Sequence, residues 1–236
     1  MIYIILGILY VLFAYDKEPS FEVCNIDGTV TEAQTVESAS RLINNSREAS
    51  VMVYSYRESG IATGSGGIFR YGSELIVITA AHTIGSADNV VMIQAQQEKY
   101  FTPVVYYDAH EDIAVLKMPV YSDYIESLRL RPLKKKDLEI GLEVTYSGYP
   151  NVGSLLTIQG YIAGLHSSGD LYMHSYGWSG ASGSSVLDNR GRLVGILIAL
   201  DVGTGILGEP TVIEDVVVVV PIWKLDFDEL DNGLSK

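Results

Sequence analysis

The chain has 236 residues and 47% hydrophobic content, which suits one large all-β unit or two small lobes that share an interface. Its 23 glycines and 16 tyrosines favour strands and tight turns over helices. A formal net charge of −13 repels phosphate backbones, so we expect no nucleic-acid partner.

The N-terminal residues 1–15 carry no charged side chain, and the charged and proline residues at 16–19 end this apolar run. The run is shorter than the roughly 20 residues that span a bilayer and is closer to the core of a signal peptide. We therefore interpret residues 1–19 as a signal or membrane-anchor segment, with a buried N-terminal strand as the alternative. The protein is expected to be secreted or anchored to a membrane through residues 1–15. Cys24 is the single cysteine, which excludes an internal disulfide.

Residues 20–47 are interpreted as a polar linker followed by a short amphipathic helix. Apolar side chains recur at helical spacing within residues 32–46, at Val36, Ala39, Leu42 and Ile43. This pattern predicts one apolar helix face that packs against the body that follows.

A first series of short β-rich segments occupies residues 48–120, separated by glycine, serine, asparagine and aspartate. The predicted strands are 51–56, 67–70, 74–79, 90–95, 100–107 and 113–117. Six such runs within about seventy residues predict one closed antiparallel barrel.

A polar connection leads to a second series within residues 121–225. Its predicted strands are 143–149, 155–164, 170–175, 185–188, 193–199 and 212–220. Helical spacing begins after Pro221, and residues 226–236 are predicted to form a C-terminal helix or tail. The predicted fold is all-β, with two six-stranded antiparallel β-barrels and short N- and C-terminal helices.

Three residues in different segments suggest nucleophilic catalysis. Ser182 lies in the glycine-rich segment 179–186, where glycines let the backbone turn sharply and point two N–H groups into one pocket. A serine hydroxyl needs a base to remove its proton, and His82 follows a predicted strand and two alanines. Asp112, at the start of another strand, can orient that base. We expect them to meet in a cleft between the barrels.

Each of these residues also has an ordinary structural explanation. A histidine after a strand is commonly packed or exposed without function, an aspartate often caps a turn, and glycines often mark a loop. Metal-dependent hydrolysis through His110, Glu111 and Asp112 is a weaker alternative, because adjacent strand residues face opposite ways. We predict no metal and no cofactor.

Four segments resemble the trypsin-like serine proteases, and most closely the HtrA/Deg-type peptidases and the glutamyl endopeptidases. These segments are 64–69, 78–82, 112–117 and 180–185, and they occur in the order found in that family. Residues 141–150 are similar to the family segment that opens the second barrel. The resemblance covers about residues 48–225. No PDZ module follows residue 225, so PDZ-regulated oligomers are not expected.

The resemblance implies a double β-barrel that hydrolyses peptide bonds of polypeptide substrates through an acyl-enzyme. His82 would be the general base, Asp112 its orienting carboxylate and Ser182 the nucleophile, with the N–H groups of Gly180 and Ser182 forming the oxyanion hole. The strand Ile198, Ala199 and Leu200 would pair with the substrate backbone. The alternative is a catalytically silent homologue that acts as a membrane-anchored binding or scaffold module.

Matching positions place Tyr176 and Gly177 at the base of the primary specificity pocket, with Leu197 and Ile198 on its wall. Leu197 replaces the histidine that glutamyl endopeptidases use, which argues against acidic substrates and for apolar P1 side chains. Ala181 replaces the acidic or amide residue that usually precedes the nucleophile, so we expect no activation by an ion pair to a new N-terminus.

Overall fold

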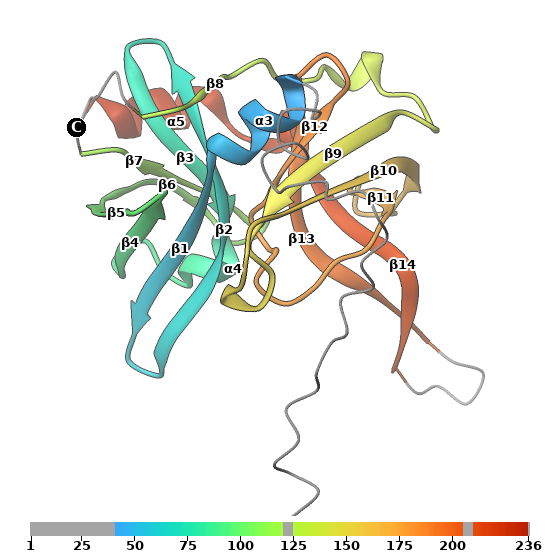
Figure 1. Ribbon diagram of the computed structural model, residues 1–236, viewed down its shortest axis with the longest axis horizontal. Helices are drawn as coiled ribbons and strands as arrows, with labels where there is room; N and C mark the ends of the chain where they lie inside the picture. The colour runs from blue at the N-terminus through green and yellow to red at the C-terminus, as the bar shows by residue number, and fades with distance from the viewer. Residues whose placement is uncertain (1–40, 120–124, 205–209, 236) are drawn as a thin grey trace, which may run out of the picture. The chain divides into compact units, whose positions relative to one another are not determined.

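The computed structural model describes residues 41–119, 125–204 and 210–235, and β-strands dominate these ranges. They form two sheets that lie side by side and share a hydrophobic cluster (Figure 1). The first sheet contains β1 (Ser50–Arg57), β2 (Gly60–Tyr71), β3 (Glu74–Ala80), β4 (Val90–Ala95), β5 (Glu98–Thr102), β6 (Val104–Asp108), β7 (Ile113–Lys117) and β8 (Leu128–Arg129). The second contains β9 (Glu143–Gly148), β10 (Leu156–Leu165), β11 (Leu171–His174), β12 (Ser185–Asp188), β13 (Leu193–Thr204) and β14 (Pro210–Pro221).

The first sheet has eight strands where the sequence predicted a closed barrel of six, and it is a curled half-barrel. Its strand order is β5-β4-β1-β2-β3-β7-β6, and β8 adds to β2 in parallel. Its two end strands are consecutive in the chain, separated only by Pro103. The predicted strand 100–107 is thus two strands, because proline has no N–H to donate to a ladder and breaks it. The short link across Pro103 holds the two ends of the sheet together, so the sheet has to curl.

The second sheet is a closed antiparallel barrel with the strand order β10-β11-β14-β13-β12-β9. Register shifts interrupt its ladders, including one between Leu197 and Ala199 in β13. Such β-bulges increase local twist and help a small sheet to close. Together with the curled first sheet, this barrel confirms the predicted all-β double-barrel class.

Strand β3 is buried on both faces, which explains its uninterrupted apolar sequence. Leu75 and Val77 pack in the core of the first sheet. Ile76 and Ile78 face the other way and pack in a cluster with Ile196 and other residues of the second barrel. The end of β3 is therefore fixed by two hydrophobic clusters at once.

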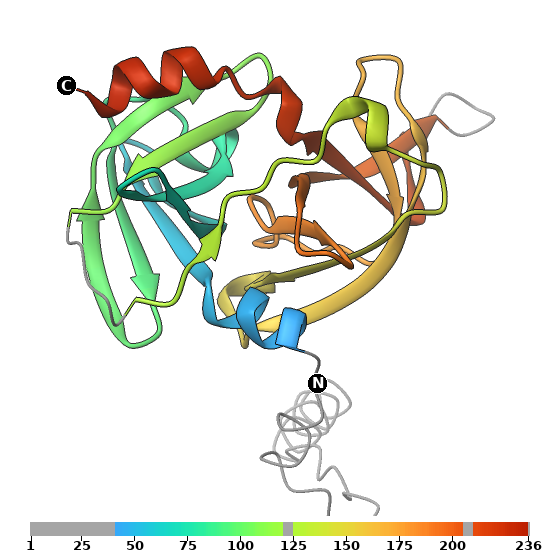
Figure 2. The ribbon, with the colours of Figure 1, turned by 90° about the horizontal axis from the view of Figure 1, so that it is seen from above.

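Short helices flank the two sheets. Helix α3 (Arg41–Glu48) contacts β9, the helical turn α4 (Ala81–Ile84) follows β3, and α5 (Phe227–Leu234) contacts β6 (Figure 2). Short 3-10 turns lie at η1 (Lys135–Asp137), η2 (Pro150–Val152) and η3 (Ile222–Lys224). A Cβ at Gly233 would lie 2.0 Å from the Val105 carbonyl oxygen, so glycine is needed where α5 meets β6.

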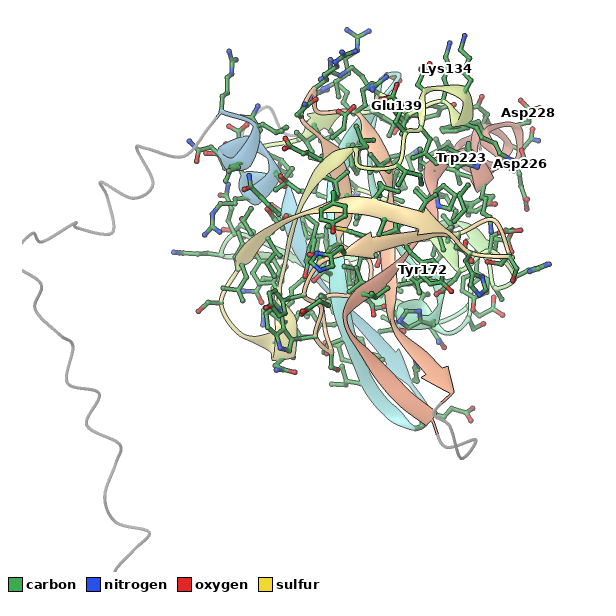
Figure 3. All side chains as sticks on the ribbon, turned by 90° about the vertical axis from the view of Figure 1, so that its right-hand side faces the viewer. Lys134, Glu139, Tyr172, Trp223, Asp226 and Asp228 are labelled. Atoms are coloured by element: carbon green, nitrogen blue, oxygen red, sulfur yellow. The ribbon has the colours of Figure 1, made fainter. Side chains whose placement is uncertain are left out.

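The C-terminal helix begins with a side-chain cap. Asp226 accepts hydrogen bonds from the N–H groups of Asp228 and Glu229, both at 3.0 Å (Figure 3). This capping satisfies donors that have no partner within the helix and explains why α5 starts after Asp226.

The N-terminal predictions fall outside the described residues, apart from the end of the amphipathic helix, where Leu42 and Ile43 are half-buried. The signal or anchor segment and the linker stay predictions. Among the residues that are described, no helix is long and apolar enough to cross a membrane. The predicted boundary between the barrels, at residue 120, lies within 120–124, which is also outside the described ranges.

Candidate active site

His82 occupies the second position of the helical turn α4, directly after strand β3. Side chains of strand β1 hold the backbone of this turn. The Arg57 guanidinium donates to the carbonyl of His82 and, at 2.6 Å, to that of Thr83. Ser55 Oγ donates to the Ile84 carbonyl at 2.6 Å. The carbonyls at the end of such a short turn otherwise lack partners, so these contacts fix the imidazole's attachment point.

Asp112 lies in the turn between β6 and β7, with a positive φ of 55°. Asp108 stabilises this turn, since its Oδ1 accepts the N–H groups of His110 and Glu111 at 2.8 and 3.0 Å. The Asp112 carbonyl also accepts the Ala81 N–H at 3.2 Å, which ties the turn to α4. A non-glycine residue adopts this left-handed conformation only when its surroundings hold it there.

The Asp112 carboxylate contacts His82 with both oxygens. Oδ2 lies 2.7 Å from His82 Nδ1, and Oδ1 accepts the backbone N–H of His82 at 2.7 Å. A carboxylate only accepts, so Nδ1 carries a proton, and in the neutral imidazole Nε2 is then the accepting nitrogen. The His82 side chain is 48% exposed and that of Asp112 22%, so Nε2 can be reached from solvent.

The loop that carries Ser182 depends on two glycines with positive φ, 91° at Gly180 and 92° at Gly183. A Cβ on Gly183 would lie 2.0 Å from the Ser65 carbonyl oxygen. The loop therefore packs backbone against backbone with the first sheet, which only glycine allows. The Ser182 hydroxyl is partly exposed and donates to the Ile198 carbonyl at 3.1 Å.

Gly64 lies between the turn that carries His82 and the loop that carries Ser182. A Cβ on Gly64 would lie 2.6 Å from Thr83 Cγ2 and 2.9 Å from the Ser182 carbonyl oxygen. The residue after His82 and the backbone of Ser182 thus both lie close to the same glycine. Together with the contact between His82 and Asp112, this places all three predicted catalytic residues in one region.

Two backbone N–H groups of the loop, those of Gly180 and Ser182, are without a hydrogen-bond acceptor in the part of the chain that the structure describes. Their neighbours are used internally: Ala181 N–H donates to Trp178 at 3.0 Å and Gly183 N–H to Leu197 at 2.7 Å. These free donors are the pair that the sequence predicts for an oxyanion hole.

The predicted substrate-binding residues fall into different environments. Tyr176 is 60% exposed, and Gly177 and Ile198 are half-buried beside the loop. The Leu197 side chain is only 2% exposed and packs in the core of the second barrel, so it does not line an open pocket. Ala199 and Leu200 continue β13 and pair with β14, and their side chains lie outside the description. The apolar P1 preference stays a prediction.

Tyr176 and Trp178 stack on each other with ring centroids 6.0 Å apart, which forms an exposed aromatic pair beside the loop. The Tyr146 hydroxyl donates to the Tyr176 carbonyl and so fixes the backbone at Tyr176. Burial raises the pKa of Tyr146, so this hydroxyl stays a donor at neutral pH.

The alternative metal site does not form. The Glu111 carboxylate lies 2.6 Å from Lys224 Nζ, whereas Asp112 turns toward His82. In the described ranges, no group of three histidine, cysteine, aspartate or glutamate side chains is arranged to hold a metal ion.

Lys224 links the turn that contains Asp112 to the second barrel. Its Nζ lies 2.6 Å from the Glu111 carboxylate in that turn and 2.9 Å from the Asp170 carboxylate in the second barrel. Desolvation lowers the pKa of Lys224, but its hydrogen bonds to Glu111 and Asp170 outweigh this effect and raise the pKa above the ordinary 10.5. The ion pairs therefore stabilise the fold fully at neutral pH and are lost only as the pH rises through the raised value.

Lys224→Met should lower the free energy of unfolding by about 2 kcal/mol at pH 7, because it leaves two partly buried carboxylates without their cation. Urea denaturation measures this loss, which should shrink at strongly alkaline pH. Lys117→Met is the control, since Lys117 makes a more exposed pair with Glu74 at 3.5 Å and should cost less than about 1 kcal/mol. Equal losses for both variants would contradict the prediction.

Comparison with known proteins identifies the family. The family model for the trypsin-like peptidase domain matches residues 59–196, which is more than half of the chain. The chain belongs to the trypsin-like peptidase family. This confirms the resemblance drawn from the four sequence motifs. A search of curated proteins found no significant match.

Solved structures show the same fold. The serine endoprotease from Yersinia pestis matches with a TM-score of 0.65 and 20% identity, over 81% of this chain and 66% of that chain. The Rv3671c protease from M. tuberculosis matches in its active form with a TM-score of 0.61 and 19% identity, over 83% of each chain. Its inactive form matches with a TM-score of 0.60 and 17% identity, over 82% of this chain and 91% of that chain. This trypsin-like peptidase thus spans just under two thirds of the Yersinia chain.

Several residues that shape the site were not singled out from the sequence. Arg57 holds the turn of His82, and Asn151 donates its N–H to the Ser179 carbonyl at 2.6 Å. Trp178 flanks the loop, and Ser65 contacts it from the first sheet. Only Ser65 lies in a segment that the sequence motifs include, where it is enclosed by glycines.

Proposed function

We propose that the protein is a serine endopeptidase in which Ser182 is the nucleophile, His82 the general base and Asp112 the orienting carboxylate. The observation that carries this proposal is the two-point contact between Asp112 and His82, which leaves Nε2 as a proton acceptor. A histidine with a merely structural role would not need its ring nitrogen held by a carboxylate in a strained turn.

Acylation then follows from the positions of these groups. Nε2 of His82 takes the proton of the Ser182 hydroxyl while Oγ bonds to the substrate carbonyl carbon. The carbonyl π electrons move to oxygen, and the free N–H groups of Gly180 and Ser182 stabilise that oxyanion. When the intermediate collapses, the C–N bond breaks and His82 returns the proton to the leaving amine. Water repeats the sequence to release the acid and restore Ser182.

Substrate binding would also prepare the nucleophile. The Ser182 hydroxyl donates to the Ile198 carbonyl at 3.1 Å, so it has to rotate before it can donate to His82. Ile198 lies on strand β13, which we propose pairs with the substrate backbone. A substrate N–H that bonds to the Ile198 carbonyl would compete with the hydroxyl and favour this rotation.

A fluorophosphonate probe should modify the wild-type protein at Ser182, since the oxygen of an activated serine displaces fluoride at phosphorus and forms a phosphonate ester. Peptide mapping by mass spectrometry identifies the modified residue. Ser182→Ala should prevent labelling and lower kcat for a peptide substrate by roughly 10⁶-fold. Ser73→Ala is the control, because Ser73 is exposed in the turn between β2 and β3.

The silent-homologue alternative predicts a different outcome. A folded wild-type protein that neither takes up the probe nor hydrolyses peptides would refute the proposed catalysis and support a binding or scaffold role. Labelling at a serine other than Ser182 would contradict the assignment of the nucleophile.

A further inference from the structure

Ser65 is a fully buried polar residue of the first sheet, with 0% exposure, and it uses every hydrogen-bonding group it has. Its N–H donates to the Ser182 carbonyl at 2.7 Å, and its own carbonyl accepts the Thr79 hydroxyl at 2.7 Å. Its hydroxyl donates to the Gly180 carbonyl at 2.8 Å and accepts the Tyr149 N–H at 2.9 Å. Ser65 thus joins the nucleophile loop, strand β3 and the turn after β9.

Ser65 contacts two carbonyls of the nucleophile loop, and it also contacts the turn that fixes the peptide plane of one free N–H group. The carbonyls of Gly180 and Ser182 bond directly to Ser65. The Ser179 carbonyl belongs to the same peptide plane as the Gly180 N–H, and it accepts the Asn151 N–H at 2.6 Å. Because Ser65 also holds Tyr149, it anchors the turn from which Asn151 donates.

Opposite groups of one planar peptide point in opposite directions, so fixing a carbonyl also fixes the N–H across the plane. The Asn151 contact fixes the Ser179 carbonyl and, through the shared peptide plane, the direction of the Gly180 N–H. Loss of the Ser65 hydroxyl would remove a partner from the Gly180 carbonyl and from the Tyr149 N–H at the same time.

Close packing around residue 65 leaves room only for a small side chain such as that of serine. A Cβ on Gly148 would lie 3.0 Å from Ser65 Oγ, and one on Gly183 would lie 2.0 Å from the Ser65 carbonyl oxygen. Both glycines leave room for the Ser65 backbone and for a small hydroxyl. Alanine fits the same space without the hydroxyl, which makes Ser65→Ala a clean deletion of that group.

We propose that Ser65 is a positioning residue that pre-organises the oxyanion hole from the neighbouring sheet, through the Gly180 carbonyl and the turn at Tyr149. The proposal rests on the proposed function, since it assigns a role in the same reaction. Ser65 does not touch the substrate. Its effect should therefore appear in the stabilisation of the tetrahedral intermediate and not in ground-state binding.

The test compares wild type, Ser65→Ala and Ser46→Ala in steady-state hydrolysis of a peptide substrate and in inhibition by a peptidyl trifluoromethyl ketone. This inhibitor forms a tetrahedral adduct with the serine and places an oxyanion in the hole. Ser65→Ala should lower kcat about 10- to 100-fold with little change in KM, and should weaken inhibition by a similar factor. Ser46→Ala is the matched control, because it removes another buried hydroxyl, which bonds to Ser147 Oγ at 2.9 Å.

A purely structural role for Ser65 would lower the melting temperature of Ser65→Ala as in Ser46→Ala and leave kcat of the folded protein unchanged. That result, in an active wild type, would overturn this proposal alone, whereas an inactive wild type would overturn the proposed function with it. If Ser65→Ala does not fold, Ser65→Cys keeps a weak donor and should show a smaller loss in kcat, and an unchanged kcat would again refute the proposal.

Discussion

Asp112→Asn should lower kcat/KM by roughly 10⁴-fold while the protein stays folded. Both carboxylate oxygens accept a hydrogen bond from His82, one from the backbone N–H and one from Nδ1. An asparagine has one accepting oxygen and one donating amide group. If the oxygen keeps the backbone contact, the amide faces Nδ1 and the ring proton moves to Nε2. His82 can then no longer accept the proton of Ser182.

Steady-state kinetics with a peptide substrate measures this loss, and the same turn supplies the control. Asp108 uses a single oxygen, Oδ1, to accept the N–H groups of His110 and Glu111. Asparagine keeps that acceptor, so Asp108→Asn should retain nearly full activity. Activity of Asp112→Asn close to that of Asp108→Asn would show that the contact between Asp112 and His82 is not needed for catalysis.

The candidate triad was predictable because each member has a local signal in the sequence. His82 follows an apolar strand and two alanines, Asp112 begins another strand, and Ser182 is enclosed by glycines. The double-barrel class was predictable for a similar reason, since short β-rich runs and turn residues alternate along the chain. The break at Pro103 had a local signal that the predicted single strand 100–107 did not take into account, because proline interrupts a ladder.

The residues that support the triad have no comparable local signal. Ser65 and Gly180 are 115 positions apart, and their contact exists only when the two sheets meet. Arg57 caps the turn of His82 from a neighbouring strand, which the sequence does not reveal. Leu197 packs in the core of the second barrel, and the register shift that follows it, between Leu197 and Ala199, has no signal in the sequence.

Gly183→Ala should destabilise the protein by more than about 4 kcal/mol, which is beyond the range of most single substitutions. The backbone at Gly183 has φ of 92°, a region that L-residues rarely adopt. An added Cβ would lie 2.0 Å from the Ser65 carbonyl oxygen and 2.4 Å from Thr79 Oγ1. The loop has to move away from the first sheet to accept this methyl group, which breaks the hydrogen bond from Ser65 N–H to the Ser182 carbonyl.

Gly72→Ala is the control that measures the energetic cost of a positive φ without a steric clash. Gly72 also has a positive φ, 59°, but nothing lies within 4 Å of its added Cβ. The control should therefore cost only about 1 kcal/mol, the conformational penalty alone. Urea denaturation followed by circular dichroism compares the two variants, and equal losses would mean that the nucleophile loop does not pack against Ser65 as closely as the structure places it. Because the same loop carries Ser182, any folded Gly183→Ala protein should also react more slowly with a fluorophosphonate than Gly72→Ala does.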